Sequence, residues 1–313
     1  MSEPPASAFD FSRREEAAAA TPVLALAALS CFAANSLLCR LALGSGSIGA
    51  GAYSAVRLIS GAVVLLPVAL SRRRASGGAR LPGNGASAAM LFLYAVPFSY
   101  AYRTLTAGTG ALILFAAVQA TMLGAAILGG ERPRPRQWFG LLLALAGLAY
   151  LVRPGLAAPS PAGAALMTLA GAAWGVYSLR GRGSADPLAD TAGNFLRVAL
   201  PALIIGGGAM SLGEGLASPR GIGLAIASGV IASGAGYAIW YAALRGLTAT
   251  RAAAVQLTVP VLAAAGGVAF LGERVTPRLL AASAAILGGV ALAVAARGRA
   301  RAAAPSPSRA AGP

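Results

Sequence analysis

Ten apolar runs of about 20 residues each follow one another along the chain and leave few folds open to it. Their approximate limits are 22–41, 52–70, 87–105, 108–129, 136–153, 162–180, 192–212, 221–244, 250–271 and 278–296. The runs are continuously apolar, whereas the strands of a membrane barrel alternate. Because a backbone in lipid must satisfy its own hydrogen bonds, the runs predict an all-α integral membrane protein with ten transmembrane helices.

The composition agrees with a bilayer as the solvent. Of the 313 residues, 57% are hydrophobic and 11% are charged, against about 25% charged residues in a soluble domain. The net charge of +16 comes from Arg, which stands mostly at the ends of the apolar runs. Arg at these positions favours anchoring at the membrane surface and contact with lipid, and the pattern lacks the basic patch of a nucleic-acid-binding protein.

The charge distribution also predicts an orientation. If the N-terminus is cytoplasmic, 18 Arg residues fall on the cytoplasmic side and 7 on the other. The positive-inside rule then places both termini in the cytoplasm. The end segments, residues 1–21 and 297–313, are rich in Pro, Ser, Ala and charge, and we expect both to be disordered cytoplasmic tails.

The sequence contains an internal duplication. Gly130-Glu131-Arg132 is answered 142 positions later by Gly272-Glu273-Arg274, and each copy closes one apolar run and leads through a Pro-Arg pair into the next. The match divides the chain into a first repeat, 22–153, and a second, 162–296. We predict that the repeated residues are structural hinges between the fourth and fifth helices of each repeat: Gly130, Glu131, Gly272 and Glu273.

Five spans per repeat is an odd number, so the second repeat must enter the membrane upside down relative to the first. Glu131 and Glu273 are then expected on opposite membrane faces. Inverted repeats are typical of transporters, in which two halves alternate between inward-open and outward-open shapes around a site at the midplane. The duplication therefore favours a carrier over a non-transporting structural membrane protein.

Several of these features resemble the drug/metabolite transporter superfamily, and specifically its ten-span proteins with two EamA-type repeats. The likeness covers about residues 22–296 and rests on both hinge copies, the Arg near the start of each second helix, the run from Gly236 to Leu244, Val259-Pro260 and Trp174. It implies two inverted five-helix repeats in the bacterial inner membrane and the export of a small metabolite. Two departures are Phe32-Ala33-Ala34-Asn35, which keeps only the Asn of the family's first-helix motif, and Val118, where the fourth helix usually has Pro.

Polar and aromatic residues inside the spans are the candidates for a substrate cavity, because polar groups in a bilayer must face protein or water. Tyr237, Trp240 and Tyr241 share one helix face by their spacing. Helix packing and interhelical hydrogen bonds remain alternative roles for such residues. The cavity candidates are Asn35, Tyr94, Gln119, Trp174, Tyr177, Asn194, Tyr237, Trp240, Tyr241 and Gln256.

One Arg lies about one turn inside the second helix of each repeat: Arg57 in the first and Arg197 in the second. The sequence favours snorkelling of both side chains to the headgroups, with binding of a substrate carboxylate as the alternative. For Glu131 and Glu273 it favours a structural ion pair or a bond to the backbone over proton coupling.

No Asp or Glu lies within the spans, which argues against exchange of a cation for a proton. An amino acid-like substrate that is zwitterionic, anionic or neutral fits better. The chain has no His, and Cys31 and Cys39 are about 12 Å apart on one helix, so neither a metal nor another cofactor is expected, and a membrane-embedded enzyme is the weaker alternative. The sequence thus predicts a secondary transporter of a small molecule and leaves its oligomeric state open.

Overall fold

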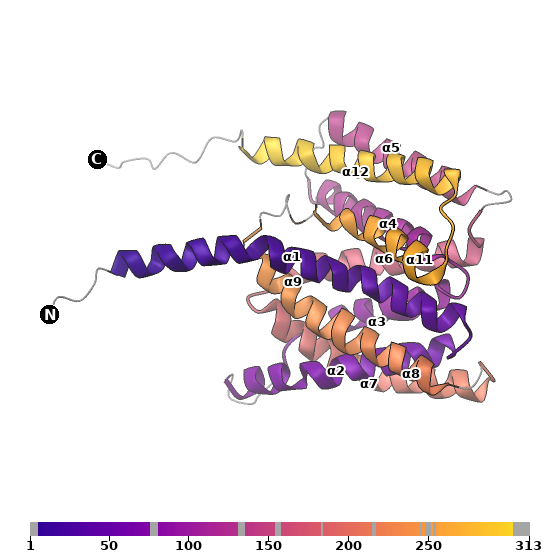
Figure 1. Ribbon diagram of the computed structural model, residues 1–313. Helices are drawn as coiled ribbons and strands as arrows, with labels where there is room; N and C mark the ends of the chain where they lie inside the picture. The colour runs from indigo at the N-terminus through magenta and orange to yellow at the C-terminus, as the bar shows by residue number, and fades with distance from the viewer. Residues whose placement is uncertain are drawn as a thin grey trace, which may run out of the picture.

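The computed structural model describes residues 6–75, 81–130, 135–153, 158–182, 184–214, 217–244, 246–247, 252 and 255–302, and all secondary structure in these ranges is helical (Figure 1). The helices of the first repeat are α1 (Ala6–Gly44), α2 (Ala50–Ala75), α3 (Gly85–Ala101), α4 (Ala107–Leu128) and α5 (Pro135–Val152). Those of the second are α6 (Pro161–Gly181), α7 (Pro187–Ser211), α8 (Pro219–Ala227), the π-helix η1 (Ser228–Ala235), α9 (Gly236–Leu244), α11 (Thr258–Leu271) and α12 (Pro277–Ala302).

The all-α membrane architecture predicted from the sequence is confirmed. In the described residues, seven helical segments are long and apolar enough to cross a membrane, with α8, η1 and α9 counted together as one. Three shorter apolar helices, Gly85–Ala101, Thr258–Leu271 and Pro277–Leu292, occupy the remaining predicted runs. The helix α1 begins at Ala6, within the segment expected to be a tail, and its apolar span is Ala20–Gly44.

The starts of the helices follow from local sequence. Three helices of the second repeat begin with a capping residue and a Pro at the first helical position, where the missing N–H costs nothing. The caps are Ser160, which accepts a hydrogen bond from Gly163 N, Asp186, which accepts one from Ala189 N, and Ser218, which accepts one from Gly221 N. Two hinge glycines have the left-handed backbone that ends a helix, Gly130 at φ +88° and Gly272 at φ +64°.

Corresponding helices of the two repeats pack against each other. The helix α2 lies along α7 at one edge of the bundle and α5 lies along α12 at the opposite edge, with α4 against α11 between them (Figure 1). The first and third helices of each repeat pack crosswise. The third helix of the first repeat, α3, packs on α6, the first helix of the second, and α1 packs on η1 and α9, which belong to the third run of the second. This arrangement places α1, α3, α4, α6, α9 and α11 in the middle, where both repeats contribute to one interior.

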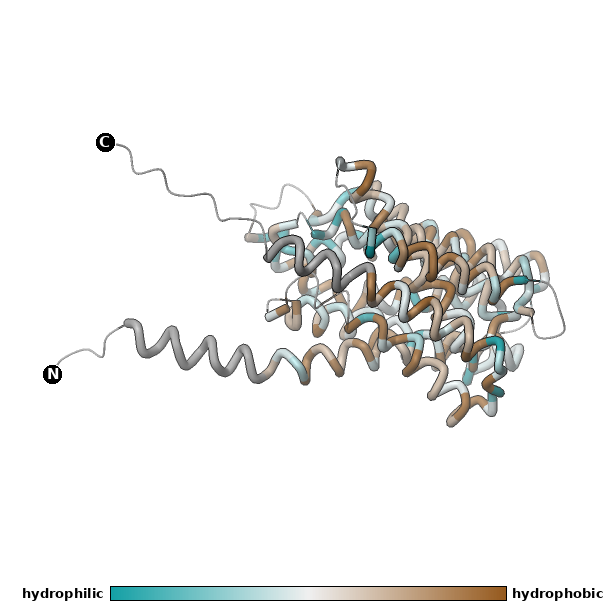
Figure 2. Tube along the Cα trace, turned by 90° about the horizontal axis from the view of Figure 1, so that it is seen from above, coloured by the Kyte–Doolittle hydropathy of each residue, from teal (hydrophilic) through white to brown (hydrophobic). Residues whose placement is uncertain are grey.

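The helices are mainly hydrophobic along their length, and hydrophilic residues gather toward the two ends of the bundle (Figure 2). Large hydrophobic side chains point outward from several helices, including Phe139 and Leu142 on α5, Leu200 and Ile204 on α7, and Leu280 on α12. Such a surface is suited to hydrocarbon and explains why so few charged residues are needed to cover the fold. The helix α1 begins, and α12 ends, on the same side of the bundle (Figure 1).

Candidate functional site

A closed cavity lies in the middle of the bundle, between the two repeats. Its walls come from α1, α3 and α4 of the first repeat and from α6, η1, α9 and the segment before α11 of the second. The lining residues are Phe32, Asn35, Ser36, Tyr94, Phe98, Leu114, Phe115, Trp174, Ala232, Tyr237 and Gln256. The volume is about 30 Å³, enough for about two waters and far below the roughly 300–1,000 Å³ of a ligand pocket. The cavity in this structure is therefore too small to hold a metabolite.

Trp174 is the centre of the aromatic wall. Its ring stacks on Tyr237 at 5.2 Å between ring centroids and on Tyr177 at 5.4 Å, with interplanar angles of 28° and 25°. It also contacts Tyr94 at 4.8 Å. Such pairs contribute about 0.5–1.5 kcal/mol each beyond the area they bury, so these contacts stabilise the aromatic wall.

Phe32 forms the facing part of the wall. Its ring meets the edges of Tyr237 at 5.9 Å and of Trp240 at 5.8 Å. Trp240 is thereby packed behind Phe32 and is 7% exposed. Phe32 and Trp174 stand 142 positions apart, the offset of the duplication, so equivalent positions of the two repeats both line the cavity and both contact Tyr237.

A chain of hydrogen bonds crosses the cavity wall between the repeats. Ser228 Oγ donates to Asn35 Oδ1 at 2.7 Å, and Asn35 Nδ2 donates to Tyr94 Oη at 3.2 Å. Arg57 Nη2 donates to the same Tyr94 oxygen at 3.2 Å. The phenolic oxygen thus accepts two bonds, and its own O–H is left to donate. Ser228 belongs to η1, and π-helical turns of this kind occur frequently at functional sites.

Arg57 is buried at the core, with 2% of its surface exposed. Its Nε donates to Ser233 Oγ at 3.3 Å, and its guanidinium carbon lies 5.3 Å from the centroid of the Tyr94 ring and 5.0 Å from that of Phe98. The third nitrogen, Nη1, is buried and has no hydrogen-bond partner. The prediction that Arg57 snorkels to the headgroups is therefore wrong, because its helix turns the side chain into the protein interior.

Arg197 has a different environment. Its Nη2 donates to Leu81 O at 3.0 Å, and its Nη1 donates to Gly193 O at 3.0 Å and to Pro82 O. The side chain therefore joins α7 to the segment that leads into α3. The expectation of snorkelling is therefore contradicted for Arg57, which contacts the cavity-lining residues Tyr94 and Phe98, and stays a prediction for the half-buried Arg197.

Three of the predicted cavity residues line a separate small pocket of about 20 Å³ at the end of the bundle where α1 begins: Tyr177, Asn194 and Tyr241. Thr191 Oγ1 is 2.9 Å from Tyr177 Oη and 3.2 Å from Tyr241 Oη. Asn194 Oδ1 accepts a hydrogen bond from Asn84 N at 3.0 Å. These side chains join α6, α7 and α9 to the start of α3, so they close this end of the bundle.

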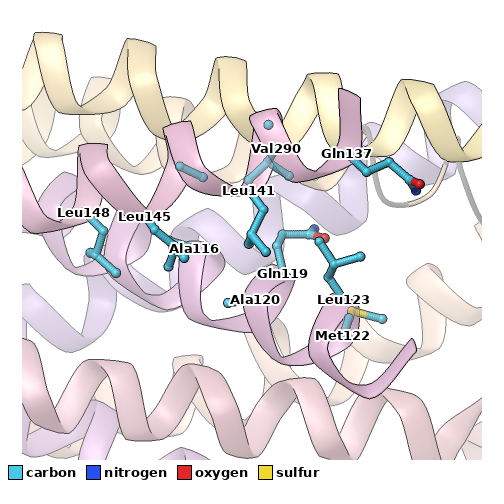
Figure 3. A pocket seen from close by; sticks show the side chains of 12 residues that line it. Ala116, Gln119, Ala120, Met122, Leu123, Gln137, Leu141, Leu145, Leu148 and Val290 are labelled. Atoms are coloured by element: carbon cyan, nitrogen blue, oxygen red, sulfur yellow. The ribbon is translucent and has the colours of Figure 1, made fainter. Parts of the chain in front are cut away.

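Gln119 lies away from the central cavity. It borders a pocket of about 60 Å³ between α4, α5 and α12, whose other walls include Gln137, Leu141 and Val290 (Figure 3). Its Nε2 is buried without a hydrogen-bond partner. Of the ten candidates, the structure thus brings five to the central cavity: Asn35, Tyr94, Trp174, Tyr237 and Gln256.

Glu273 closes the opposite end of the bundle. Its carboxylate accepts hydrogen bonds from Ala107 N at 3.0 and 2.9 Å and lies 3.4 Å from Arg40 Nε. Arg40 Nη1 in turn donates to Tyr102 O at 3.1 Å and to Arg103 O at 3.2 Å. The hinge of the second repeat is therefore bound to α1 and to the first turn of α4, both in the first repeat. The equivalent Glu131 lies outside the described residues.

Sequence reasoning gave too little weight to Arg57 and did not identify Ser228 and Ser233. A usable signal was present in Ser228-Gly229 and Ser233-Gly234, two small polar pairs inside one apolar run. A Cβ at position 229 would overlap Ser60 Oγ and the carbonyl of Arg57, so the glycine lets η1 approach α2 closely. In the described residues no three His, Cys, Asp or Glu side chains come together as metal ligands.

The family model for the EamA-like transporter family matches residues 20–153 and again residues 161–295. The chain belongs to this family. Its resemblance to the drug/metabolite transporter superfamily is thereby confirmed, and the two matches support an architecture of two repeats. The family and two of the relatives described next, a transporter and an exporter by name, support a membrane transporter as the function class.

Three relatives match between 72% and 88% of this chain. The chain is 51% identical over 276 residues to the uncharacterized protein PA1977 of Pseudomonas aeruginosa, covering 88% of this chain and 94% of the relative. It is 29% identical over 252 residues to the threonine/homoserine exporter RhtA of Escherichia coli K12, covering 77% and 80%. Identity to the uncharacterized transporter YwfM of Bacillus subtilis is 29% over 231 residues, covering 72% and 78%. A solved crystal structure matches with a TM-score of 0.61 at 20% identity, over 88% of this chain and 97% of that one, which shows the shared fold.

Proposed function

We propose that the protein is a secondary transporter that exports a small metabolite across the bacterial inner membrane by alternating access between two inverted repeats. In this proposal the chain crosses the membrane ten times, and both termini are cytoplasmic. The observation that carries the proposal is the closed cavity between the repeats, whose walls are built from helices of both. A site shared by two halves opens to either face when the halves rock against each other.

The two closed ends support this mechanism. One end is held by the Glu273 contacts to Arg40 and Ala107, and the other by the hydrogen bonds among Tyr177, Thr191 and Tyr241. The first set joins the two repeats. The second set lies within the second repeat, and Asn194 Oδ1, which accepts a hydrogen bond from Asn84 N, links this end to the start of α3 in the first repeat. Breaking one set while the other persists gives an opening to one side of the membrane, which is what alternating access requires.

The substrate class follows from the lining and from one relative. Stacked aromatic rings and a few polar groups suit a small organic molecule with an apolar part and hydrogen-bonding groups. RhtA is named as an exporter of threonine and homoserine, which favours amino acid-like molecules and export here. In the described part of the chain no carboxylate lines the cavity, which favours a zwitterionic, anionic or neutral substrate over a cation.

Counterflow in liposomes tests the function. Purified protein is reconstituted into vesicles loaded with one unlabelled compound from a panel of amino acids, hydroxy acids and their amides, and uptake of the same labelled compound is measured. We expect uptake for at least one compound, and its loss in Ala232→Phe, which fills the cavity from η1. Val63→Phe, on the exposed face of α2, is the matched control and keeps the uptake. Absence of uptake across the panel by well-folded protein, or full uptake by Ala232→Phe, contradicts the proposal.

A further inference from the structure

The central cavity has a buried positive charge beside it with no negative partner. The Arg57 guanidinium stays protonated in proteins, and it is 2% exposed. Two of its nitrogens donate to hydroxyl groups of Ser233 and Tyr94, while Nη1 has no partner. Neutral hydroxyls satisfy hydrogen bonds but leave the charge uncompensated, and buried charges are ordinarily paired.

The chain offers no carboxylate for this role in its described part. Only four acidic side chains are described there, and all are engaged at the ends of the bundle. Asp186 pairs with Arg72, and Asp190 accepts from Gly83 N and Ser184. Glu214 accepts from Gly51 N and Tyr100, and Glu273 is bound to Ala107 and Arg40. None of them contacts Arg57.

The position of the guanidinium connects it to the cavity. It lies over the rings of Tyr94 and Phe98, both of which line the cavity, and it shares the Tyr94 oxygen with Asn35, a third lining residue. A guanidinium presents its N–H groups as a planar fork that matches the two oxygens of a carboxylate. Tyr94 retains an O–H to donate, so the part of the cavity wall around Tyr94 and Arg57 supplies several hydrogen-bond donors and one full positive charge.

We propose that Arg57 is the anchor for a carboxylate group of the transported substrate, with Tyr94 and Asn35 as its neighbouring hydrogen-bonding groups. This inference rests on the proposed function and narrows it to substrates that carry a carboxylate. In the closed structure the cavity is too small for a substrate, so Tyr94 must shift when the carboxylate reaches Nη1. The bound anion then supplies the counter-charge that the described protein lacks around Arg57.

The test compares each carboxylic acid with its own carboxamide, whose amide group has nearly the same shape as the carboxylate and lacks its negative charge. Binding is measured as the stabilisation of purified protein against heat, and transport as inhibition of counterflow, across the panel of amino acids and hydroxy acids. A hydrogen-bonded charge is worth about 1.5–3 kcal/mol, so we expect the parent to bind the acid about 10- to 100-fold more tightly than the amide. The ratio of acid affinity to amide affinity should fall to about one in Arg57→Met and Arg57→Gln, and Arg57→Lys should keep part of the preference for the acid.

Arg197→Met is the matched control. It removes an equivalent side chain whose donors face backbone carbonyls, so it should leave the acid-to-amide ratio as in the parent. A purely structural role of Arg57 would weaken acid and amide together and preserve their ratio, which would overturn the proposal. If the Arg57 variants do not fold, equal affinity of the parent for acid and amide overturns it as well. Selective stabilisation by acids without any flux would instead refute the transport function and leave the anchor in place.

Discussion

The contacts of Glu273 predict that one substitution opens a single end of the protein. The carboxylate joins the hinge after α11 to Ala107 N, at the start of α4, and to Arg40, at the end of α1. All these contacts cross from the second repeat to the first, so they must break when this end opens. Glu273→Gln keeps an oxygen that can accept a hydrogen bond from Ala107 N but removes the negative charge.

The size of the effect follows from three contributions. A charge-assisted hydrogen bond exceeds a neutral one by about 1 kcal/mol, and a negative charge at a helix N-terminus adds about 0.3–1 kcal/mol. The Arg40 pair adds about 0.2–1 kcal/mol, since both side chains are only partly exposed, at 25% and 11%. The sum is about 2 kcal/mol, which corresponds to a change of about 30-fold in the equilibrium between closed and open states.

Cysteine accessibility measures this change directly. Ser36 lines the central cavity and is 2% exposed, so Ser36→Cys, with Cys31 and Cys39 replaced by Ser, gives one buried thiol. A membrane-impermeant thiol reagent is added to whole cells or to inverted vesicles. We expect Glu273→Gln to raise the labelling rate about 30-fold from the face that carries Glu273 and not from the other. An unchanged rate, or an equal rise from both faces, would refute the assignment of Glu273 to one closed end.

Three further substitutions separate packing, cavity and surface roles. Gly229→Ala should lower the stability of the fold by about 1–3 kcal/mol, because the added Cβ overlaps α2. Gly223→Ala, on the same helical segment but with open space around it, should leave the stability unchanged, and thermal melting in detergent compares the two variants. Gln119→Leu should leave transport unchanged and keep or raise the melting temperature, because it removes a buried nitrogen without a partner; reduced transport would place Gln119 in the transport path. Trp174→Leu removes three ring contacts and should raise the half-saturating substrate concentration by about tenfold, while Trp138→Leu, 44% exposed on α5, should leave it unchanged in the same flux assay.

The sequence was sufficient for the all-helical membrane fold and the two repeats, because apolar run length and duplication are properties of the chain alone. The direction in which a polar residue points depends on how each helix is rotated within the bundle, and the runs here are apolar on nearly every side. Gln119 and Gln256 therefore looked alike in the sequence, yet they lie in different pockets. The duplication itself distinguishes them. The counterpart of Gln256 is Leu114, which lines the cavity, and the counterpart of Gln119 is Val261, which is 53% exposed.

The same comparison shows where the two repeats have diverged. Phe32 and Trp174, like Leu114 and Gln256, are equivalent positions that both face the cavity, so the duplication supplies a matched pair of walls. The polar groups do not match.

Asn35 corresponds to Tyr177, which lines the pocket at the end where α1 begins. The π-helix η1 has no π-helical counterpart in the described α3, and it brings Ser233 to Arg57. A single substrate molecule is itself asymmetric, so a site on the axis between two equal halves can orient it only if their chemistry differs. In this protein the charge of Arg57 and the π-turn that brings Ser233 to it give the proposed site that difference.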